Sequence, residues 1–166
     1  TCNVLMAASI AKGTTTIRDA AKEPEVQELA NFLNEMGAQI SGIGTNTLVI
    51  EGVEKLNGIK WRVQPDRIEA ATFAIAALIT KGDVLLRSVN PEQMTSTIDH
   101  LKECGAVIEQ KDEHSIRVAY PEDVAMKSVD LTTAPYPALA TDVQPLFCAL
   151  FGLLEGECKI RETIYL

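Results

Sequence analysis

The sequence predicts a mixed α/β (α+β) fold in which apolar helices lie in the middle and sheets cover them from outside. The first observation is that the chain of 166 residues contains about two and a half copies of one structural unit. Self-similarity of this kind identifies the whole fold. The second is that each copy has a helical segment that is apolar on every face, and such helices are buried all round. The third is that the strand segments alternate apolar and polar residues, as half-buried strands do.

The second copy, residues 61–120, shows the order of elements most clearly. An apolar helical run is followed by a strand, a second helix and two further strands, at residues 68–79, 84–87, 91–104, 107–110 and 115–120. The first copy repeats this order, and the third contains only the apolar run 143–154 and the strand 158–161. We therefore expect a single partial domain over residues 1–166, with repeat one at 1–58, repeat two at 59–127 and a truncated repeat three at 128–166.

Each full copy contains two kinds of helix. The first kind is apolar all round, at residues 4–11, 73–79 and 146–154. The second kind is amphipathic, with Val26, Leu29 and Leu33 on one stripe of the first copy, and is expected to cover the core with one buried face. If the third copy is truncated, apolar surface should be exposed around Leu146, Phe147 and Phe151.

The helix starts are marked by capping residues. Asp66 with Glu69 has the spacing of a capping box, and Thr141 with Gln144 has the same spacing. Asn90 precedes a proline, which is a good N-cap followed by the residue most favoured at the first helical position.

Composition limits the function classes. The net charge of −8 and the sequence pI of about 4.8 argue against nucleic acid or an anionic membrane as the main partner. No apolar run reaches the roughly 18 residues of a membrane-spanning helix, and the N-terminus has no basic segment typical of a signal peptide.

The four cysteines lack metal-ligand spacing and are expected to be free cytosolic thiols, at Cys2, Cys104, Cys148 and Cys158. His100 and His114 are expected to be solvated, so we predict no metal site.

Several polar residues at helix starts are candidates for chemistry. Glu23 stands before a proline where the second copy has Asn90, although glutamate is not a favoured N-cap. It either complements the helix dipole at the surface or holds its carboxylate toward a cleft. Capping alone would explain Asp66. If Thr141 caps its own helix, Asp142 is free in the first turn to act as a general base or to bind a hydroxylated ligand.

One arginine recurs in each copy, near the end of the strand that follows the apolar helix. These are Arg18, Arg87 and Arg161. Recurrence in every copy favours a structural task, such as pairing with a neighbouring carboxylate, over substrate binding.

Several of these segments together resemble one family, that of UDP-N-acetylglucosamine 1-carboxyvinyltransferase, an enolpyruvyl transferase. The resemblance runs from residue 1 to residue 164 and is carried by residues 3–8, 21–26, 31–33, 37–45, 49–53, 65–70, 133–135 and 141–144. It implies an inside-out α/β barrel of βαβαββ repeats, similar to EPSP synthase. It also implies a bacterial cytoplasmic enzyme that transfers an enolpyruvyl group from phosphoenolpyruvate to the 3-hydroxyl of UDP-N-acetylglucosamine (UDP-GlcNAc). That transfer is the first committed step of peptidoglycan synthesis and needs no cofactor.

The resemblance also implies roles for individual residues. Asp142 matches the proposed general base, which contacts the 3-hydroxyl, and the neighbouring Thr141 belongs to the same substrate-binding segment. Ile164 matches a position whose backbone contacts the sugar nucleotide. Glu23, Asp66 and Arg67 match residues that line the substrate cleft.

The chain departs from the family in two respects. The catalytic loop cysteine and the groups that bind phosphoenolpyruvate would lie before Thr1, so the chain alone is expected to be inactive and to need the remainder of the enzyme. The segment before Thr141 is Tyr-Pro-Ala-Leu-Ala, whereas the family usually has His-Pro-Gly-Phe-Pro.

Two other functions are left open. One is a 3-phosphoshikimate 1-carboxyvinyltransferase-like enzyme, although its phosphorylated substrate would favour basic residues where this chain has Glu23 and Asp66. The other is a non-catalytic repeat domain that binds a partner, which would require a fully covered core.

Overall fold

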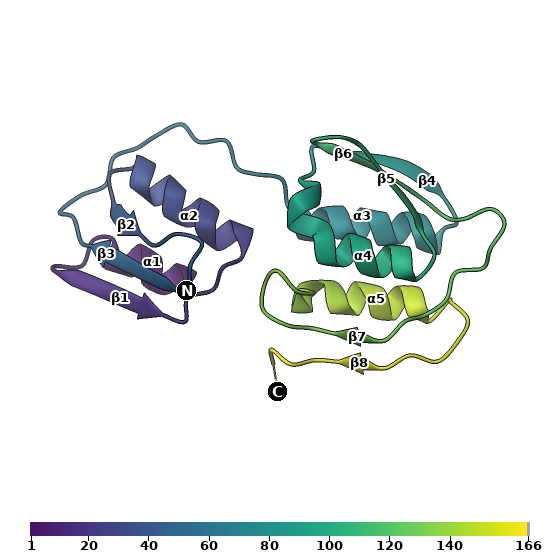
Figure 1. The fold of residues 1–166 in the computed structure, drawn as a ribbon. Helices are drawn as coiled ribbons and strands as arrows, with labels where there is room; N and C mark the ends of the chain where they lie inside the picture. The colour runs from purple at the N-terminus through teal and green to yellow at the C-terminus, as the bar shows by residue number, and fades with distance from the viewer. Residues whose placement is uncertain (166) are drawn as a thin grey trace. The chain divides into compact units, whose positions relative to one another are not determined.

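The computed structural model describes residues 1–165, and the chain forms two compact units, Thr1–Gln64 and Pro65–Leu166. Each unit contains both helices and strands, which confirms the predicted mixed α/β class (Figure 1). The division falls six residues after the predicted boundary between repeats one and two. The grouping into one partial domain, its three repeat boundaries and the closure into a barrel stay predictions.

The first unit is a three-stranded antiparallel sheet covered by two helices. Its elements are α1 (Cys2–Ala8), β1 (Thr14–Arg18), α2 (Pro24–Glu35), β2 (Gln39–Ser41) and β3 (Thr47–Glu51), with strand order β1-β3-β2. Ile40, Leu48 and Ile50 from the sheet pack against Leu5 of α1 and Leu33 of α2, and all five are at most 7% exposed. The alternation along β3 therefore places one strand face on the helices, as predicted.

The second unit contains two sheets. Its elements are α3 (Arg67–Ile79), β4 (Asp83–Arg87), the 3-10 helix η1 (Pro91–Met94), α4 (Thr95–Glu103), β5 (Val107–Asp112), β6 (Ser115–Ala119), β7 (Leu131–Thr132), the 3-10 helix η2 (Thr141–Val143), α5 (Gln144–Phe151) and β8 (Ile160–Arg161). Strands β4, β6 and β5 form an antiparallel sheet in that order, and β7 pairs in parallel with β8. Parallel strands need a crossover connection, which α5 supplies here.

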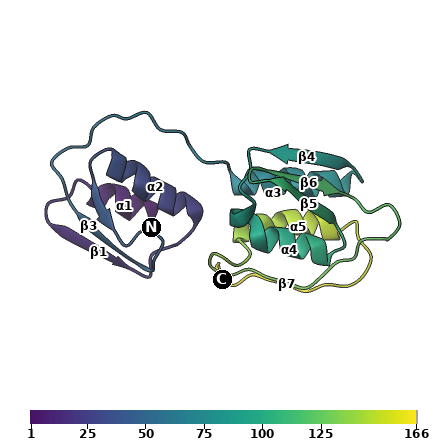
Figure 2. The ribbon, with the colours of Figure 1, turned by 45° about the horizontal axis from the view of Figure 1, so that its top comes forward.

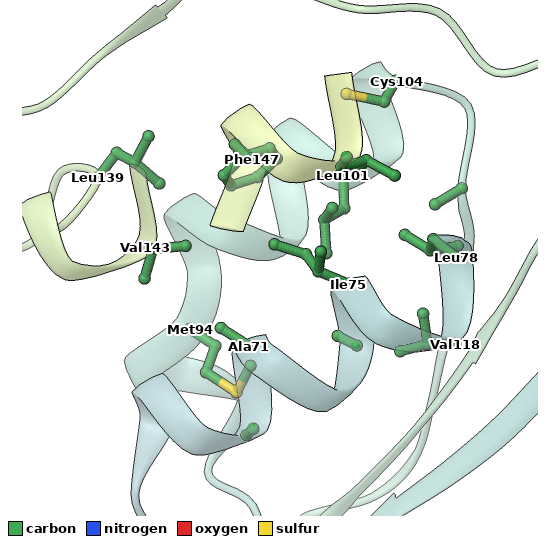
Figure 3. Packing of buried hydrophobic residues seen from close by; sticks show 14 of the residues in the cluster. Ala71, Ile75, Leu78, Met94, Leu101, Cys104, Val118, Leu139, Val143 and Phe147 are labelled. Carbon is green, nitrogen blue, oxygen red and sulfur yellow. The ribbon is translucent and has the colours of Figure 1, made fainter. Parts of the chain in front are cut away.

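In the second unit the helices lie between the two sheets. Two views agree that α3, α4 and α5 separate the β4-β6-β5 sheet from the β7-β8 pair (Figures 1 and 2). Figure 3 shows the core that this arrangement encloses, where Ile75 of α3, Leu101 of α4 and Phe147 of α5 converge. The predicted order of helices inside and sheets outside is thus present in this unit.

The expectation that the apolar helices are buried all round is wrong for the described chain. Val4 and Met6 on α1 are 51% and 46% exposed, and Phe73 on α3 is 56% exposed. The predicted exposure of Phe147 and Phe151 is also wrong, because both rings are buried in the core cluster that α5 shares with α3 and α4. The physical reason is the same for both errors. An all-round apolar pattern does not say which flank the available neighbours cover.

The recurring arginines mark equivalent places in the structure. Arg18, Arg87 and Arg161 are the last residues of β1, β4 and β8. Within residues 1–165 none of them forms an ion pair, so the suggested pairing with a carboxylate is not present. A different arginine, Arg117 on β6, bridges Asp83 of β4 and a glutamate of β5.

Candidate functional site

The site in the second unit begins with Asp66, at the start of α3. Its carboxylate accepts hydrogen bonds from the backbone N–H groups of Ile68 and Glu69, at 2.8 and 3.1 Å. The predicted capping role of Asp66 is therefore confirmed, and it satisfies two of the donors that every helix start leaves unpaired. Its proposed second role, in substrate binding, stays a prediction.

Arg67 follows as the first residue of α3. Its guanidinium carbon lies 5.6 Å from the ring centroid of Tyr136, within the range of a cation–π contact. Tyr136 belongs to residues 133–140, which connect β7 to η2. The contact therefore ties the start of α3 to the segment that leads into Thr141.

The predicted capping box at Thr141 and Gln144 does not form. Ala140 occupies the N-cap of η2, and the Gln144 side chain donates to the sulfur of Cys148 instead. The Thr141 hydroxyl donates to the carboxylate of Glu162 at 2.7 Å, and no side-chain capping bond is made at the start of η2. Asp142 is exposed and has no hydrogen bond or ion pair within residues 1–165. A carboxylate in this condition can accept a proton or a hydrogen bond from a ligand.

Glu162 is the site residue that the sequence analysis missed. Oε1 accepts hydrogen bonds from the Thr133 hydroxyl and from the backbone N–H groups of Ile164 and Tyr165, while Oε2 accepts the bond from Thr141. The distances are 2.8, 2.6, 3.2 and 2.7 Å in that order. The Thr141 hydroxyl is the largest cause that lowers the pKa of Glu162 to about 2, followed among the lowering contributions by the Ile164 amide and Thr133. Donors that bind the charged form lower an acid's pKa in this way.

Ile164 is thus held close to Thr141 through the shared carboxylate of Glu162. Because its N–H donates to Glu162, the backbone group of Ile164 that is left for a ligand is its carbonyl. The structure therefore brings Arg67, Thr141, Asp142 and Ile164 into one connected set of loops and helix starts. Their assignment to substrate binding stays a prediction.

Glu23 lies in the first unit, at the N-cap of α2. It makes no capping hydrogen bond through its side chain, and its Oε2 atom is buried without a hydrogen-bond partner among the described residues. Buried carboxylate oxygens are normally paired, so a solvated surface role does not describe this atom well. The choice between the two interpretations of Glu23 stays open to experiment.

The remaining features of residues 1–165 concern metal ions, membranes and a surface depression. Within residues 1–165 no group of three or more histidine, cysteine or acidic side chains could hold a metal ion. No helix in this part of the chain is long and apolar enough to cross a bilayer. A depression of about 340 Å³ in the first unit contains none of the predicted site residues, and is lined by Asn34, Ala38, Gln39, Ile40, Ser41, Val49 and Glu51.

Comparison with known families defines the class of this protein. The model of the EPSP synthase (3-phosphoshikimate 1-carboxyvinyltransferase) family matches residues 1–165. The chain therefore belongs to this family of carboxyvinyltransferases.

Curated relatives give a narrower similarity. The chain is 50% identical over 163 residues to the UDP-N-acetylglucosamine 1-carboxyvinyltransferase of Hydrogenovibrio crunogenus, which covers 98% of this chain and 38% of the relative. The proteins of the same name from Methylacidiphilum infernorum and Finegoldia magna are 48% and 46% identical over 99% of this chain, and 38% and 39% of their own lengths are covered. The chain thus spans well under half the length of these relatives.

A solved structure supports the fold. The enolpyruvyl transferase NikO from Streptomyces tendae superposes with a TM-score of 0.79 at 26% identity, over 97% of this chain and 38% of that protein. The predicted enolpyruvyl transferase-like fold is confirmed.

The two aspartates should differ in their effect on stability. We expect Asp66→Ala to lower the free energy of unfolding by about 1 kcal/mol, because it removes an N-cap, and Asp66→Asn to lose much less. Asp142→Ala is the matched control and should stay within about 0.5 kcal/mol of the wild type, since its carboxylate has no partner within residues 1–165. Chemical denaturation of the chain measures all three variants, and equal losses at both positions would contradict this difference.

Glu162 should make stability depend on pH in the acid range. Its pKa is about 2 in the folded chain and ordinarily about 4.5, so the unfolded chain binds the extra proton between these values. The stabilisation is complete above about 4.5 and is lost as the pH falls toward 2. We therefore expect the difference in unfolding free energy between the wild type and Glu162→Gln to shrink over this window. Glu157→Gln, an exposed neighbour, should show no such change.

Proposed function

We propose that the longer protein to which this chain belongs is a UDP-GlcNAc 1-carboxyvinyltransferase, and that the chain alone is inactive. The observation that supports it best is the identity of 46–50% over nearly all of this chain to proteins of that name from three different bacteria. The reaction joins the 3-oxygen of the sugar to the central carbon of phosphoenolpyruvate and releases phosphate. On this proposal, the longer protein is a bacterial cytoplasmic enzyme of peptidoglycan synthesis. It would then contribute to cell-wall growth, cell shape and cell division.

Asp142 is the proposed general base. It lies in the first turn of η2, is exposed and has no partner within residues 1–165, so its carboxylate is available to take the proton of the 3-hydroxyl. Asp66, by contrast, already accepts two backbone hydrogen bonds. The difference in hydrogen bonding favours Asp142 over Asp66 as the base.

Ile164 and Arg67 are proposed to hold the substrate. The N–H of Ile164 is used by Glu162, and its carbonyl, an acceptor, suits a donor on the sugar nucleotide. Arg67 contacts Tyr136 in the segment that leads into Thr141, and a guanidinium suits the diphosphate of the nucleotide. Glu23, Asp66 and Thr141 belong to the same proposed substrate-binding set, and no metal ion or cofactor is proposed.

A 3-phosphoshikimate 1-carboxyvinyltransferase activity is the second candidate, because the family model carries that description. A non-catalytic binding domain is less well supported. Such a domain should cover its apolar helices, whereas Val4 on α1 and Phe73 on α3 are each more than half exposed. The exposed helix flanks fit a chain that is part of something longer.

Titration calorimetry on the longer protein tests the substrate directly. We expect UDP-GlcNAc to bind and shikimate 3-phosphate not to bind under the same conditions. Binding of shikimate 3-phosphate without UDP-GlcNAc would replace the proposed function with the second candidate. The 166-residue chain, assayed beside the longer protein, should show no turnover.

Asp142→Asn tests the proposed base. In the longer protein we expect turnover to fall by about 10² to 10⁴-fold, the usual contribution of a general base, because the amide cannot take the proton. UDP-GlcNAc binding should remain measurable by calorimetry, since asparagine keeps the size and one acceptor oxygen. Turnover equal to that of the wild type would exclude Asp142 as the base.

A further inference from the structure

We propose that Glu162 is a positioning residue that holds the segments carrying Asp142 and Ile164 in one fixed arrangement around the sugar nucleotide. This inference rests on the proposed function and deepens it. Glu162 itself is not proposed to touch the substrate, but it sets the positions of Asp142 and Ile164, which are. No sequence motif identified Glu162. Its assignment comes from its contacts.

The geometry joins three separate parts of the chain at one carboxylate. Thr133 follows β7, Thr141 begins η2, and the Ile164 and Tyr165 amides belong to the segment after β8. Thr133 is fully buried, so its hydroxyl is an anchored donor and not a mobile surface group. Thr163 strengthens the connection, since its N–H donates to the Thr133 hydroxyl at 2.9 Å and its own hydroxyl donates to the Thr133 carbonyl.

The bond to Thr141 explains why Asp142 is available. A threonine at a helix start ordinarily turns its oxygen toward the backbone N–H groups of the first turn. Here its hydroxyl is directed to Glu162, and the chain enters η2 as a 3-10 turn with Ala140 at the N-cap. Asp142 is the next residue, so its direction depends on the backbone of Thr141, whose side chain Glu162 holds.

The other repeats of the chain supply an internal comparison. The residues that follow the recurring arginines are Asp19, Ser88 and Glu162. Asp19 and Ser88 both adopt a left-handed backbone, with φ of 52° and 54°, and the next N–H bonds to the turn between the last two strands of its sheet. Glu162 is not among the described residues with positive φ. Its side chain instead accepts hydrogen bonds from Thr133, Thr141 and the segment after β8. The third repeat departs from the other two at this position, beside Asp142 and Ile164.

The charge of Glu162 suits a positioning task. With a pKa of about 2 it stays ionised at any pH used for an assay, so it accepts hydrogen bonds and does not exchange protons with the substrate. An ionised carboxylate bound to several N–H and O–H donors forms the stronger class of hydrogen bond. Its loss should therefore loosen both segments together.

Steady-state kinetics of the longer protein test the proposal. We expect Glu162→Ala to lower kcat by about 10²-fold, the loss that a displacement of about 1 Å can cause, and to raise the KM for UDP-GlcNAc. The KM for phosphoenolpyruvate should change little. Glu162→Gln keeps one acceptor oxygen and should recover part of the lost kcat, whereas Glu157→Ala, which removes the same charge from an exposed neighbouring position, should behave as wild type.

A double-mutant cycle shows whether Glu162 acts through Thr141. Thr141→Val removes the hydroxyl and keeps the shape of the side chain. If the two residues act through their shared bond, the loss of kcat in Thr141→Val/Glu162→Ala should be smaller than the product of the two single losses. Independent losses would contradict the proposed route.

Amide hydrogen exchange tests the same contact without any assay of activity. The Ile164 and Tyr165 amides should exchange faster in Glu162→Gln and Glu162→Ala than in the wild type and in Glu157→Ala. Unchanged exchange, unchanged kcat, or an equal rise of both KM values in a protein of lowered melting temperature would each overturn the proposal. Absence of UDP-GlcNAc binding and turnover in the wild type would instead disprove the proposed function, and the exchange rates would still decide whether Glu162 holds these segments.

Discussion

Burial of α3 is the constraint on which the second unit depends. Six of its thirteen residues are buried, and four of these are alanines, which let neighbouring elements approach the helix backbone closely. One side of α3 packs on the β4-β6-β5 sheet and another on α5. The position of α5 then determines where its flanking strands β7 and β8 pair, because α5 is the crossover between them. The loops that carry the candidate site are the ends of these elements, so their placement follows from the packing of one apolar helix.

The ends of several helices were predictable because their determinants are local. Gly37 and Gly105 follow the C-caps of the amphipathic helices α2 and α4, and their φ values of 106° and 101° are conformations that glycine adopts without strain. In each case the following N–H bonds back to the helix carbonyl five residues earlier. Asp66 caps α3 as its spacing with Glu69 indicated. Such signals depend only on residues within one turn of each other, and therefore they can be recognised in a sequence.

The features that could not be predicted depend on contacts between distant segments. The Thr141 capping box satisfied the local rule, yet its hydroxyl bonds to a residue 21 positions further along the chain. Phe147 and Phe151 belong to an all-round apolar pattern that does not indicate which flank meets α3 and α4. Glu162 has no distinguishing neighbours in sequence, and only its partners at Thr133 and Thr141 identify it. Long-range pairing of this kind requires the tertiary structure.

Asp66 and Asp142 show how the form of a helix start decides what a carboxylate can do. At α3 the chain enters the helix through Asp66 itself in an extended conformation, with φ of −78° and ψ of 111°, so the carboxylate turns back onto the backbone donors. At η2 the N-cap is Ala140, and Asp142 comes after the helix has begun. Its carboxylate therefore does not cap the helix start. A difference of two residues in position relative to the N-cap thus commits one carboxylate to stability and leaves the other available for a ligand. Because Glu162 holds Thr141 out of the capping position, the same contact that orders the loops also preserves the chemical freedom of Asp142.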